Sequence, residues 1–529
     1  MNTKRINPRA LRLATLLCFA LFVQYGFSIP YSLRTTPIEN GNGRTGIIWN
    51  SITTIDIDSI INSDSLKLFL DNEEINVGAI YSYDAGIWHY THYSSLDGAA
   101  NLYLSILDDY ISGYIITYSG NYSIQSLSHN QIIIAKRIEE EISNDYESLD
   151  VDNYSEDDGD FTFVSVDDTP IIRVLFLYTD SVWDSISHTS GTTPTNLKMI
   201  SLALTVINQA NESFVNSNID AQLELAYLGL THYNESQHSW NNAINHFCQD
   251  NDGFMDEVHA LRTKYAADVC VLLFNKSSLC GKAKTIKANY GSAFCIMYPS
   301  YGCTTDFTAA HEIGHLIGCR HNYSQDVLIT PYMYGHGYVH YVSGSPPTSW
   351  RTIMSYSNDC GGHDYQCHTI PYWSNPNIYY NGLATGTTDL ANNARVWNER
   401  AGTVAAFTNT PNSISYTSAD NNTTAIFESI NSLTQITLGN GFEIQSGQMV
   451  EMKASDKIIL GPNTLIKQGA QYYAGIETNI SRSNTPSHGS NKLNVQKKSP
   501  HSARKILRDG QLFIEHDGMV YTVTGQEVR

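Results

Sequence analysis

The segment HEIGHLIGCRH, from His311 to His321, constrains this chain more than any other. If the segment is helical, His311 and His315 are four residues apart and lie on one face, one turn above the other. Both imidazoles can then bind one metal ion, and Gly318 allows the chain to turn so that His321 returns as a third ligand. Three protein ligands leave one position open, which is typical of catalytic rather than structural zinc sites.

The residue after the first histidine is Glu312, within a helix predicted over residues 307–319. Its carboxylate is expected beside the metal, where it can take a proton from a water molecule without binding the metal itself. We therefore expect Glu312 to act as a general base. The alternative is that these are polar residues on the face of an ordinary core helix. The full spacing HExxHxxGxxH disfavours that alternative, because each further fixed position makes a chance match rarer.

The longer motif resembles that of the metzincin clan of zinc endopeptidases. The clan carries a methionine in a tight turn beyond the third histidine, where it forms a hydrophobic floor under the metal. The segment TIMSY, residues 352–356, supplies this residue as Met354. Tyr356 stands two residues later, at the spacing where astacins and serralysins carry a tyrosine that binds resting zinc and then stabilises the oxyanion. The resemblance implies this catalytic role for Tyr356, and simple packing beneath the site is the alternative.

Three segments around the motif resemble bacterial reprolysin-like enzymes and the peptidyl-Asp metallopeptidase group. These segments are residues 331–339, 350–356 and 374–376, and the resemblance covers roughly residues 170–405. The residue after the third histidine, Asn322, departs from the Asp, Glu, Ser or Pro found there in reprolysins, astacins, matrix proteases and serralysins. Placement among these subfamilies therefore stays open.

The peptidyl-Asp group implies cleavage before aspartate, which requires a cationic pocket on the primed side of the scissile bond. Three arginines are candidates for this pocket: Arg351, Arg395 and Arg400. Each of them could equally be a surface residue or a member of an ion pair.

The order of predicted elements before the zinc helix indicates an α/β domain. Strands and helices alternate, with strands expected at 171–178, 221–230 and 268–274 and helices at 195–216 and 253–265. With the resemblance, this order predicts a metzincin catalytic domain over residues 169–410, of class α/β (α+β), with a twisted mixed sheet and a zinc helix. In such domains an edge strand, here near residues 281–283, pairs with extended substrate through its backbone. The alternative is an ordinary loop, which could have the same sequence.

The cysteines beyond Cys18 all fall within the predicted catalytic domain. They are Cys248, Cys270, Cys280, Cys295, Cys303, Cys319, Cys360 and Cys367. An even number confined to one domain of an exported chain indicates up to four disulfides, and no pairing is assigned. We expect Cys319, inside the metal motif, to tether the active-site helix rather than to bind metal.

Residues 1–28 combine four basic side chains with an apolar run, which predicts a secretory signal peptide. Its removal moves the net charge from −20 to −24, and such acidity argues against nucleic acid or an anionic membrane as partner. No later segment is apolar for long enough to predict a membrane span.

Residues 29–168 read as a β-rich propeptide ending in an acidic linker, with an independent binding domain as the alternative. Because this region lacks cysteine, we expect an aspartate to block the metal in the zymogen.

Beyond residue 410 the pattern changes to short β-segments. Residues 436–454 and 458–476 share a 22-residue period, which predicts a small β-repeat module over residues 411–476. Residues 477–505, rich in Ser, Asn and Lys, read as a flexible linker. The final segment, 506–529, predicts a hairpin that resembles the C-terminal sorting regions of the Bacteroidetes type IX secretion system. This resemblance implies a bacterial protein that uses export machinery and is secreted or held at the cell surface.

Together these features predict a secreted zinc endopeptidase, made as a zymogen, that hydrolyses protein or peptide substrates. The sequence leaves the binding of calcium open. The alternative from another class is a surface adhesin or binding protein whose β-modules do the main work, with the protease domain serving its maturation.

Overall fold

The computed structural model describes residues 169–480, except 190–192, 346–347, 361–366 and 478–479, together with Ile60 and the strands between residues 31 and 137 and between residues 504 and 528. The predicted signal peptide, the acidic linker and most of the serine-rich linker lie outside the described residues. Within the described part, no helix is long and apolar enough to cross a membrane.

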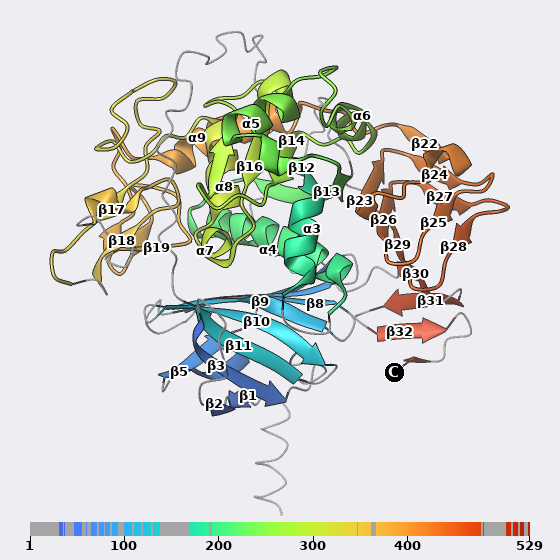
Figure 1. The fold of residues 1–529 in the computed structure, drawn as a ribbon, viewed down its shortest axis with the longest axis horizontal. Coiled ribbons are helices and arrows are strands. Elements are labelled where there is room, and N and C mark those ends of the chain that lie inside the picture. The colour runs from blue at the N-terminus through green and yellow to red at the C-terminus, as the bar shows by residue number, and fades with distance from the viewer. Residues whose placement is uncertain are drawn as a thin grey trace, which may run out of the picture.

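A mixed sheet organises the part of the chain that carries the metal motif (Figure 1). In spatial order its strands are β15 (Gly281–Ala283), β16 (Phe294–Met297), β14 (Val269–Leu273), β12 (Ile171–Thr179) and β13 (Gln222–Thr231). The last four are parallel to one another, whereas β15 pairs antiparallel with β16 at the outer edge. Because helices cover both faces, β12 and β14 are apolar runs that are buried almost throughout, as the sequence predicted.

Helices bury opposite sides of the same strands. One core lies under α3 (Asp180–Ser187), α4 (Thr195–Asn216), α8 (Thr308–Ile317) and α9 (Asn393–Val404), and the other under α5 (Trp240–Cys248) and α6 (Glu257–Lys264). Val174 and Phe176 of β12 face the first core, whereas Leu175 and Leu177 face the second, as the period of two in a strand requires. A short helix, α7 (Tyr301–Thr305), leads into α8.

The predicted helices agree with the structure unequally. The helix predicted over residues 195–216 is confirmed as α4, but the one predicted over residues 253–265 is shorter. It begins only at Glu257, because Gly253 and Met255 adopt positive φ angles of 88° and 52°. Helix α5 was not predicted, although its buried residues follow helical spacing: Trp240, Ala243, Ile244 and Phe247.

A separate sheet in the N-terminal part of the chain lies against α4 (Figure 1). Its order is β2 (Thr36–Pro37), β3 (Ile47–Thr54), β11 (Gln131–Arg137), β10 (Gly120–Ser128), β9 (Tyr110–Thr117), β8 (Ala100–Leu107), β7 (Ile87–Tyr93) and β6 (Ile80–Asp84). Ser112 of β9 hydrogen-bonds Ser201 of α4. Tyr103 of β8 is buried and meets the ring of Phe307 edge-on, with 6.3 Å between ring centroids. This sheet therefore packs beside the start of α8.

The described residues also form smaller sheets. They are β1 (Tyr31–Arg34), β4 (Ser65–Leu70) and β5 (Glu73–Gly78); β17 (Val339–His340), β18 (Trp350–Arg351) and β19 (His368–Thr369); and β20 (Tyr379–Tyr380) with β21 (Leu383–Ala384). The strand β18 matters most for the site, because it leads directly into the predicted methionine turn.

Stacked coils follow α9. Their strands are β22 (Ser413–Tyr416), β24 (Gln435–Leu438) and β27 (Lys457–Leu460); β23 (Ala425–Ser432), β26 (Met449–Ala454) and β29 (Gln471–Ile476); and β25 (Glu443–Ile444) with β28 (Leu465–Ile466). Ile414, Ile436 and Ile458 stand in parallel register, 22 residues apart. The β-repeat module predicted over residues 411–476 takes the form of a short solenoid of stacked coils. The first rung escaped notice because Thr417 stands where the later rungs carry glycine.

The solenoid continues the central sheet, because β23 pairs antiparallel with β13. Buried Arg173 of β12 donates to the carbonyl oxygen of Ser429 at 2.5 Å and to Glu224, which fastens the junction. After β29 the sheet runs through β30 (Arg504–Arg508), β31 (Gln511–His516), β32 (Met519–Thr522) and β33 (Glu527–Val528). The strands β31 and β32 form the predicted C-terminal hairpin.

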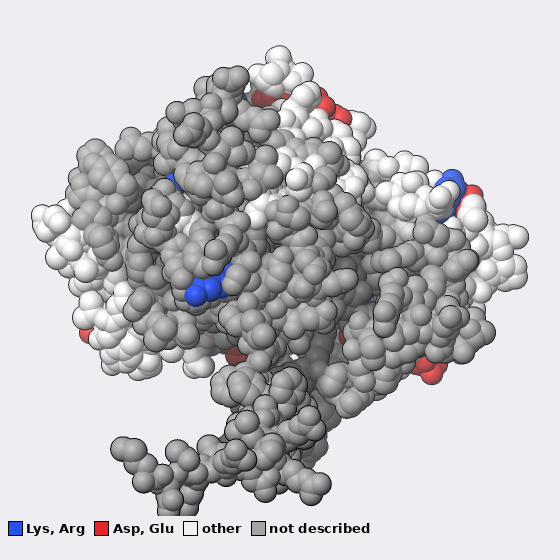
Figure 2. All heavy atoms as spheres, turned by 90° about the horizontal axis from the view of Figure 1, so that it is seen from below, with Lys and Arg blue, Asp and Glu red and all other residues white. Residues whose placement is uncertain are grey.

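Among the described atoms in Figure 2, Lys and Arg lie singly and form no continuous basic patch.

Candidate metal centre and catalytic site

The motif helix α8 ends at Ile317, two residues before the predicted end at residue 319, and the predicted turn lies at Gly318. Gly318 follows the helix with a φ of 127°, a conformation that side chains rarely adopt, and a Cβ there would lie 2.9 Å from the ring of Tyr332. The helix begins one residue later than predicted, at Thr308, because Phe307 takes a left-handed conformation with a φ of 62°. The chain turns at Gly318 and brings His321 back toward the helix.

The three motif histidines converge on one point. The Nε2 atom of His321 lies 3.1 Å from Nε2 of His311 and 3.0 Å from Nε2 of His315. Within the described residues, these three form the one group of three or more His, Cys, Asp or Glu side chains whose ligand atoms lie within 4.8 Å of one another. A tetrahedral zinc ion at about 2.0–2.1 Å from each nitrogen needs them about 3.3 Å apart, so small movements suffice to admit it.

Backbone carbonyls fix the orientation of the first two rings. Nδ1 of His311 lies 2.8 Å from the carbonyl oxygen of Ile353, and Nδ1 of His315 lies 2.9 Å from that of Cys319. Donation from Nδ1 leaves the lone pair of Nε2 free for a metal. Burial lowers the pKa of His311 to about 4 and the pKa values of His315 and His321 well below the usual range. The imidazoles are thus neutral, as metal ligands must be.

Glu312 lies in the same cleft as the first histidine. Its side chain is 3% exposed and lines a cleft of about 30 Å³ together with His311, Tyr356 and Gly281 of the edge strand β15. A Cβ added to Gly281 would overlap the Glu312 carboxyl group. Glycine at this position therefore makes room for the glutamate, a reason that the sequence alone did not indicate.

Met354 packs against α8. It is fully buried, and a Cβ added to Gly314, one residue before His315, would lie 2.8 Å from its sulfur. The preceding residue, Ile353, supplies the carbonyl that orients His311. The turn thus both packs against the helix and holds a histidine.

Tyr356 lies against the third histidine. Its ring centroid is 3.9 Å from that of His321, with the rings inclined by 31°. The backbone nitrogen of Tyr356 donates to Oδ1 of Asn322 at 2.9 Å, and Nδ2 of Asn322 donates to Asp359 at 2.7 Å. Sequence reasoning treated Asn322 as a subfamily marker and missed this contact, which joins the third histidine's turn to the methionine turn.

Histidines outside the motif support or pack against their neighbours where they are described. His336 is buried and its Nδ1 lies 2.8 Å from the carbonyl oxygen of His321, so it supports the backbone of the third histidine. His368 packs against Tyr380. His363 lies outside the described residues.

The cysteines form fewer bridges than the expected maximum. The disulfides are Cys280–Cys303 and Cys360–Cys367, whereas the unbridged cysteines are Cys248, Cys270, Cys295 and Cys319. The expectation that Cys319 tethers the helix was wrong, because its thiol is buried and unbridged, 4.0 Å from the carbonyl oxygen of Asn393. The hydrogen bond from His315 to the Cys319 carbonyl holds this end of the helix instead.

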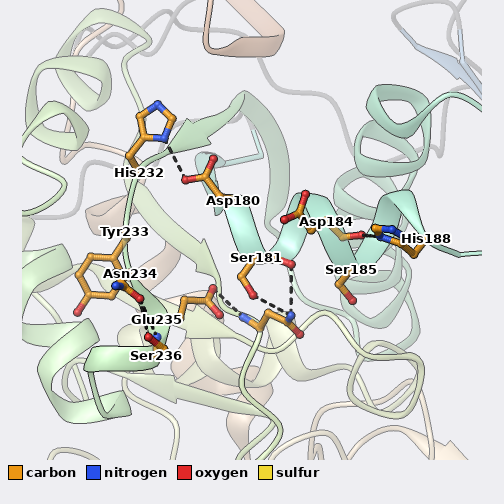
Figure 3. Close-up of a pocket in the computed structure, with 11 residues that line it drawn as sticks. Asp180, Ser181, Asp184, Ser185, His188, His232, Tyr233, Asn234, Glu235 and Ser236 are labelled. Atoms are coloured by element: carbon orange, nitrogen blue, oxygen red, sulfur yellow. Dashed lines mark hydrogen bonds and ion pairs between the residues drawn. The ribbon is translucent and has the colours of Figure 1, made fainter.

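A much larger cavity, of about 730 Å³, lies away from the three motif histidines, at the carboxyl ends of β12, β13 and β14 (Figure 3). Two of its charged groups are engaged with neighbours: Asp180 lies 3.0 Å from Nδ1 of His232, and Glu235 accepts from the backbone nitrogen of Asn275 at 2.9 Å. It contains none of the motif residues. Size is therefore a poor guide to the catalytic site, which is the small cleft beside the histidines.

Comparisons with known proteins agree with this geometry. Residues 168–367 match Reprolysin_5, metallo-peptidase family M12. The peptidyl-Asp metalloendopeptidase of Stenotrophomonas maltophilia (strain K279a) is 34% identical over 316 residues, which cover 59% of this chain and 71% of that protein. The one from Pseudomonas fragi is 32% identical over 200 residues, 38% of this chain and 99% of that protein.

Two further proteins are also similar to parts of this chain. The peptidyl-Asp metalloendopeptidase of Xanthomonas campestris pv. campestris is 40% identical over 210 residues, 40% of this chain and 47% of that protein, so the match covers about half of its length. The solved metalloproteinase-II from Bacteroides fragilis has 13% identity and a TM-score of 0.30, covering 49% of this chain and 81% of that one.

The three-histidine centre on a mixed α+β framework is that of a metallopeptidase. The chain belongs to the M12 metallopeptidase family and is a metalloendopeptidase with zinc as its cofactor.

Proposed function

We propose that this chain is a secreted endopeptidase, made as a zymogen, in which Glu312 is the general base. The observation that carries the proposal is the shared cleft of Glu312, His311 and the edge-strand residue Gly281. A carboxylate beside a metal ligand and the edge strand of the sheet puts a proton acceptor next to the position that a peptide bond would take.

Each residue of the site has its own role in hydrolysis of the peptide bond. Zinc held by the three histidines supplies a Lewis acid that polarises the scissile carbonyl and lowers the pKa of water. Glu312 takes the proton from the attacking water and passes it to the leaving amine, so no covalent intermediate with the protein forms. Tyr356, lying on His321, donates its hydroxyl to the oxyanion that develops. Met354 keeps the floor of the site apolar and fixed.

Extended substrate pairs with β15, the outermost strand of the catalytic sheet. The strand lies at the end of the sheet and pairs on its other side with β16. Backbone pairing at such an edge binds peptides with little regard to their side chains, so selectivity falls to pockets nearby. The relatives are named peptidyl-Asp metalloendopeptidases, and we assign to this chain the same preference for peptide bonds at aspartate.

Residues 29–168 serve as the propeptide, and an aspartate from this region blocks the metal until cleavage. The packing of β8 on α4 and of Tyr103 on Phe307, beside the start of the motif helix, supports this role. Changing the propeptide aspartates one at a time should release activity from the uncleaved chain at one position. No effect at any position would reject the aspartate block.

The remaining segments serve export. Residues 1–28 are the signal peptide and residues 506–529 a sorting segment read by export machinery, which leaves the mature enzyme outside the cell or on its surface. Residues 169–410 form the catalytic domain, and the solenoid over residues 411–476 extends its sheet. The serine-rich stretch 477–505 then joins the solenoid to the sorting segment.

Casein degradation tests the endopeptidase function against a role as adhesin. After removal of the propeptide, the wild type should degrade casein, and Glu312→Ala should be inactive. Equal degradation by both proteins, or none by either, would contradict the proposal.

A further inference from the structure

Arg351 is a buried cation of the catalytic cleft. It ends β18 directly before the methionine turn, is 5% exposed and lines the same cleft as His311 and Glu312. Arginine is the side chain best suited to bind a carboxylate, because its planar guanidinium offers five N–H donors.

The other two arginines considered from the sequence lie elsewhere. Arg395 is about half exposed and pairs with Glu399 one turn along α9 at 2.7 Å. Arg400, also in α9, is buried and donates to the carbonyl oxygen of Ala288. Neither lines the catalytic cleft.

The guanidinium of Arg351 is held through both terminal nitrogens, and its third nitrogen keeps a donor without a partner. Its NH1 group donates to the carbonyl oxygen of Ser355 at 2.8 Å, and its NH2 group lies 2.9 and 3.1 Å from the carboxylate oxygens of Asp306. Its Nε–H group is buried and has no hydrogen-bond partner among the described residues. A buried donor without a partner is costly, so a ligand that supplies an acceptor is favoured here.

A second feature of the cleft also favours a negative charge. Thr308, the first residue of α8, lines the cleft, and the preceding residue, Phe307, has no side chain that can cap the helix. The first backbone N–H groups of a helix carry partial positive charge and lack partners within the helix. Thr308 and Arg351 therefore line the same cleft, which the carboxylates of Asp306 and Glu312 also line.

We infer that Arg351 binds the side-chain carboxylate of the substrate aspartate that follows the scissile bond, and so sets the cleavage preference. This inference rests on the proposed endopeptidase function. Asp306 and Ser355 act as positioning residues that hold the guanidinium with its Nε–H free for the substrate.

The competing role for Arg351 is purely structural. Asp306 also accepts from the hydroxyl of Thr369, so the Arg351–Asp306 pair fastens β18 and β19 to the start of α8. A structural role predicts that losing the arginine harms every substrate equally. A binding role predicts that the loss falls on aspartate substrates.

The test uses the full mature chain and fluorogenic peptides that differ only in the residue after the cleaved bond: Asp, Asn, Glu or Ala. The wild type should cleave the Asp peptide with a kcat/KM at least about 100-fold above that for the Asn peptide. Arg351→Gln should lower kcat/KM for the Asp peptide about 100-fold and change it for the Asn peptide less than about threefold. Arg351→Lys should fall between the two, and the matched control Arg395→Gln should behave as wild type.

Zinc content and circular dichroism of each variant separate misfolding from lost recognition. Equal kcat/KM of the wild type for Asp and Asn peptides overturns the inference whether or not the variants fold. A proportional loss on both peptides in a folded Arg351→Gln variant overturns it too. Cleavage of none of the peptides, with no cleavage of casein, contradicts instead the endopeptidase function itself.

Discussion

The side-chain oxygen of Asn322 accepts a 2.9 Å hydrogen bond from the backbone nitrogen of Tyr356. The two residues are 34 positions apart, and the bond joins the turn after the third histidine to the turn that contains Met354. The same amide donates to Asp359 at 2.7 Å. One buried side chain thus sets the relative position of a metal ligand and of the proposed oxyanion donor.

Asn322→Ala should therefore damage both activity and stability. The backbone nitrogen of Tyr356 loses its acceptor, and we expect a loss of about 1–3 kcal/mol in the free energy of unfolding and about 10-fold in kcat. Gln325→Ala is the matched control, since exposed Gln325 also donates to Asp359. Urea unfolding and peptide kinetics measure both effects. Equal behaviour of the two variants would contradict the role given to Asn322.

Gly281→Ala should reduce activity while leaving the fold intact. The added methyl group would overlap the carboxyl group of Glu312, which must then move away from the position beside His311. We expect kcat/KM to fall at least about 10-fold, because small displacements of a catalytic group are costly. Gly302→Ala, whose methyl group meets nothing within 4 Å, should retain wild-type activity. Full activity of Gly281→Ala would show that the glutamate tolerates the displacement.

Tyr356→Phe should lower kcat about 10- to 100-fold without loss of zinc, because it removes only the hydroxyl proposed to stabilise the oxyanion. The ring that packs on His321 is retained, so stability should change little. Tyr323→Phe, which changes an exposed tyrosine near His336, is the control. Unchanged kinetics of Tyr356→Phe would mean that the hydroxyl does not stabilise the oxyanion and that Tyr356 only packs against its neighbours.

Glu212 of α4 should make stability fall as pH rises. Burial raises the pKa of this carboxyl from 4.5 to about 8, beside Tyr103 of the N-terminal sheet. Between these two values the folded chain holds a proton that the unfolded chain releases. The contribution of Glu212 to the free energy of unfolding should therefore be highest below pH 4.5 and decrease by about 1.4 kcal/mol per pH unit up to pH 8.

The variant Glu212→Gln removes this titration. Compared with the wild type by urea unfolding, it should be of similar stability near pH 4.5 and more stable at pH 8. Parallel pH profiles of the two proteins would mean that Glu212 is ionised in the folded state.

Local spacing was enough to predict the histidines, the turn at Gly318 and the strands on both sides of α4. These features depend on residues within one helical turn or one strand of each other, which a sequence displays directly. The position of Met354 beneath the helix followed from the resemblance, and its packing on Gly314 gives the physical reason.

Contacts between distant segments could not be predicted in this way. Asn322 meets Tyr356, and Gly281 makes room for Glu312, only after several elements have packed together. Three arginines looked equivalent in the sequence, and burial in the cleft distinguishes Arg351 from the others. The prediction of a disulfide at Cys319 was wrong for the same reason, because the pairing of cysteines depends on contacts between distant segments. In the described residues Cys319 is unbridged.

Zinc content measured together with peptide hydrolysis, on the same samples, tests the central claim most directly. The wild type should bind one zinc ion per chain, and Glu312→Gln should keep that zinc while losing at least about 1,000-fold in kcat. His315→Ala should lose both zinc and activity. Substantial hydrolysis by Glu312→Gln, or full zinc in a chain that lacks His315, would contradict the account of this site.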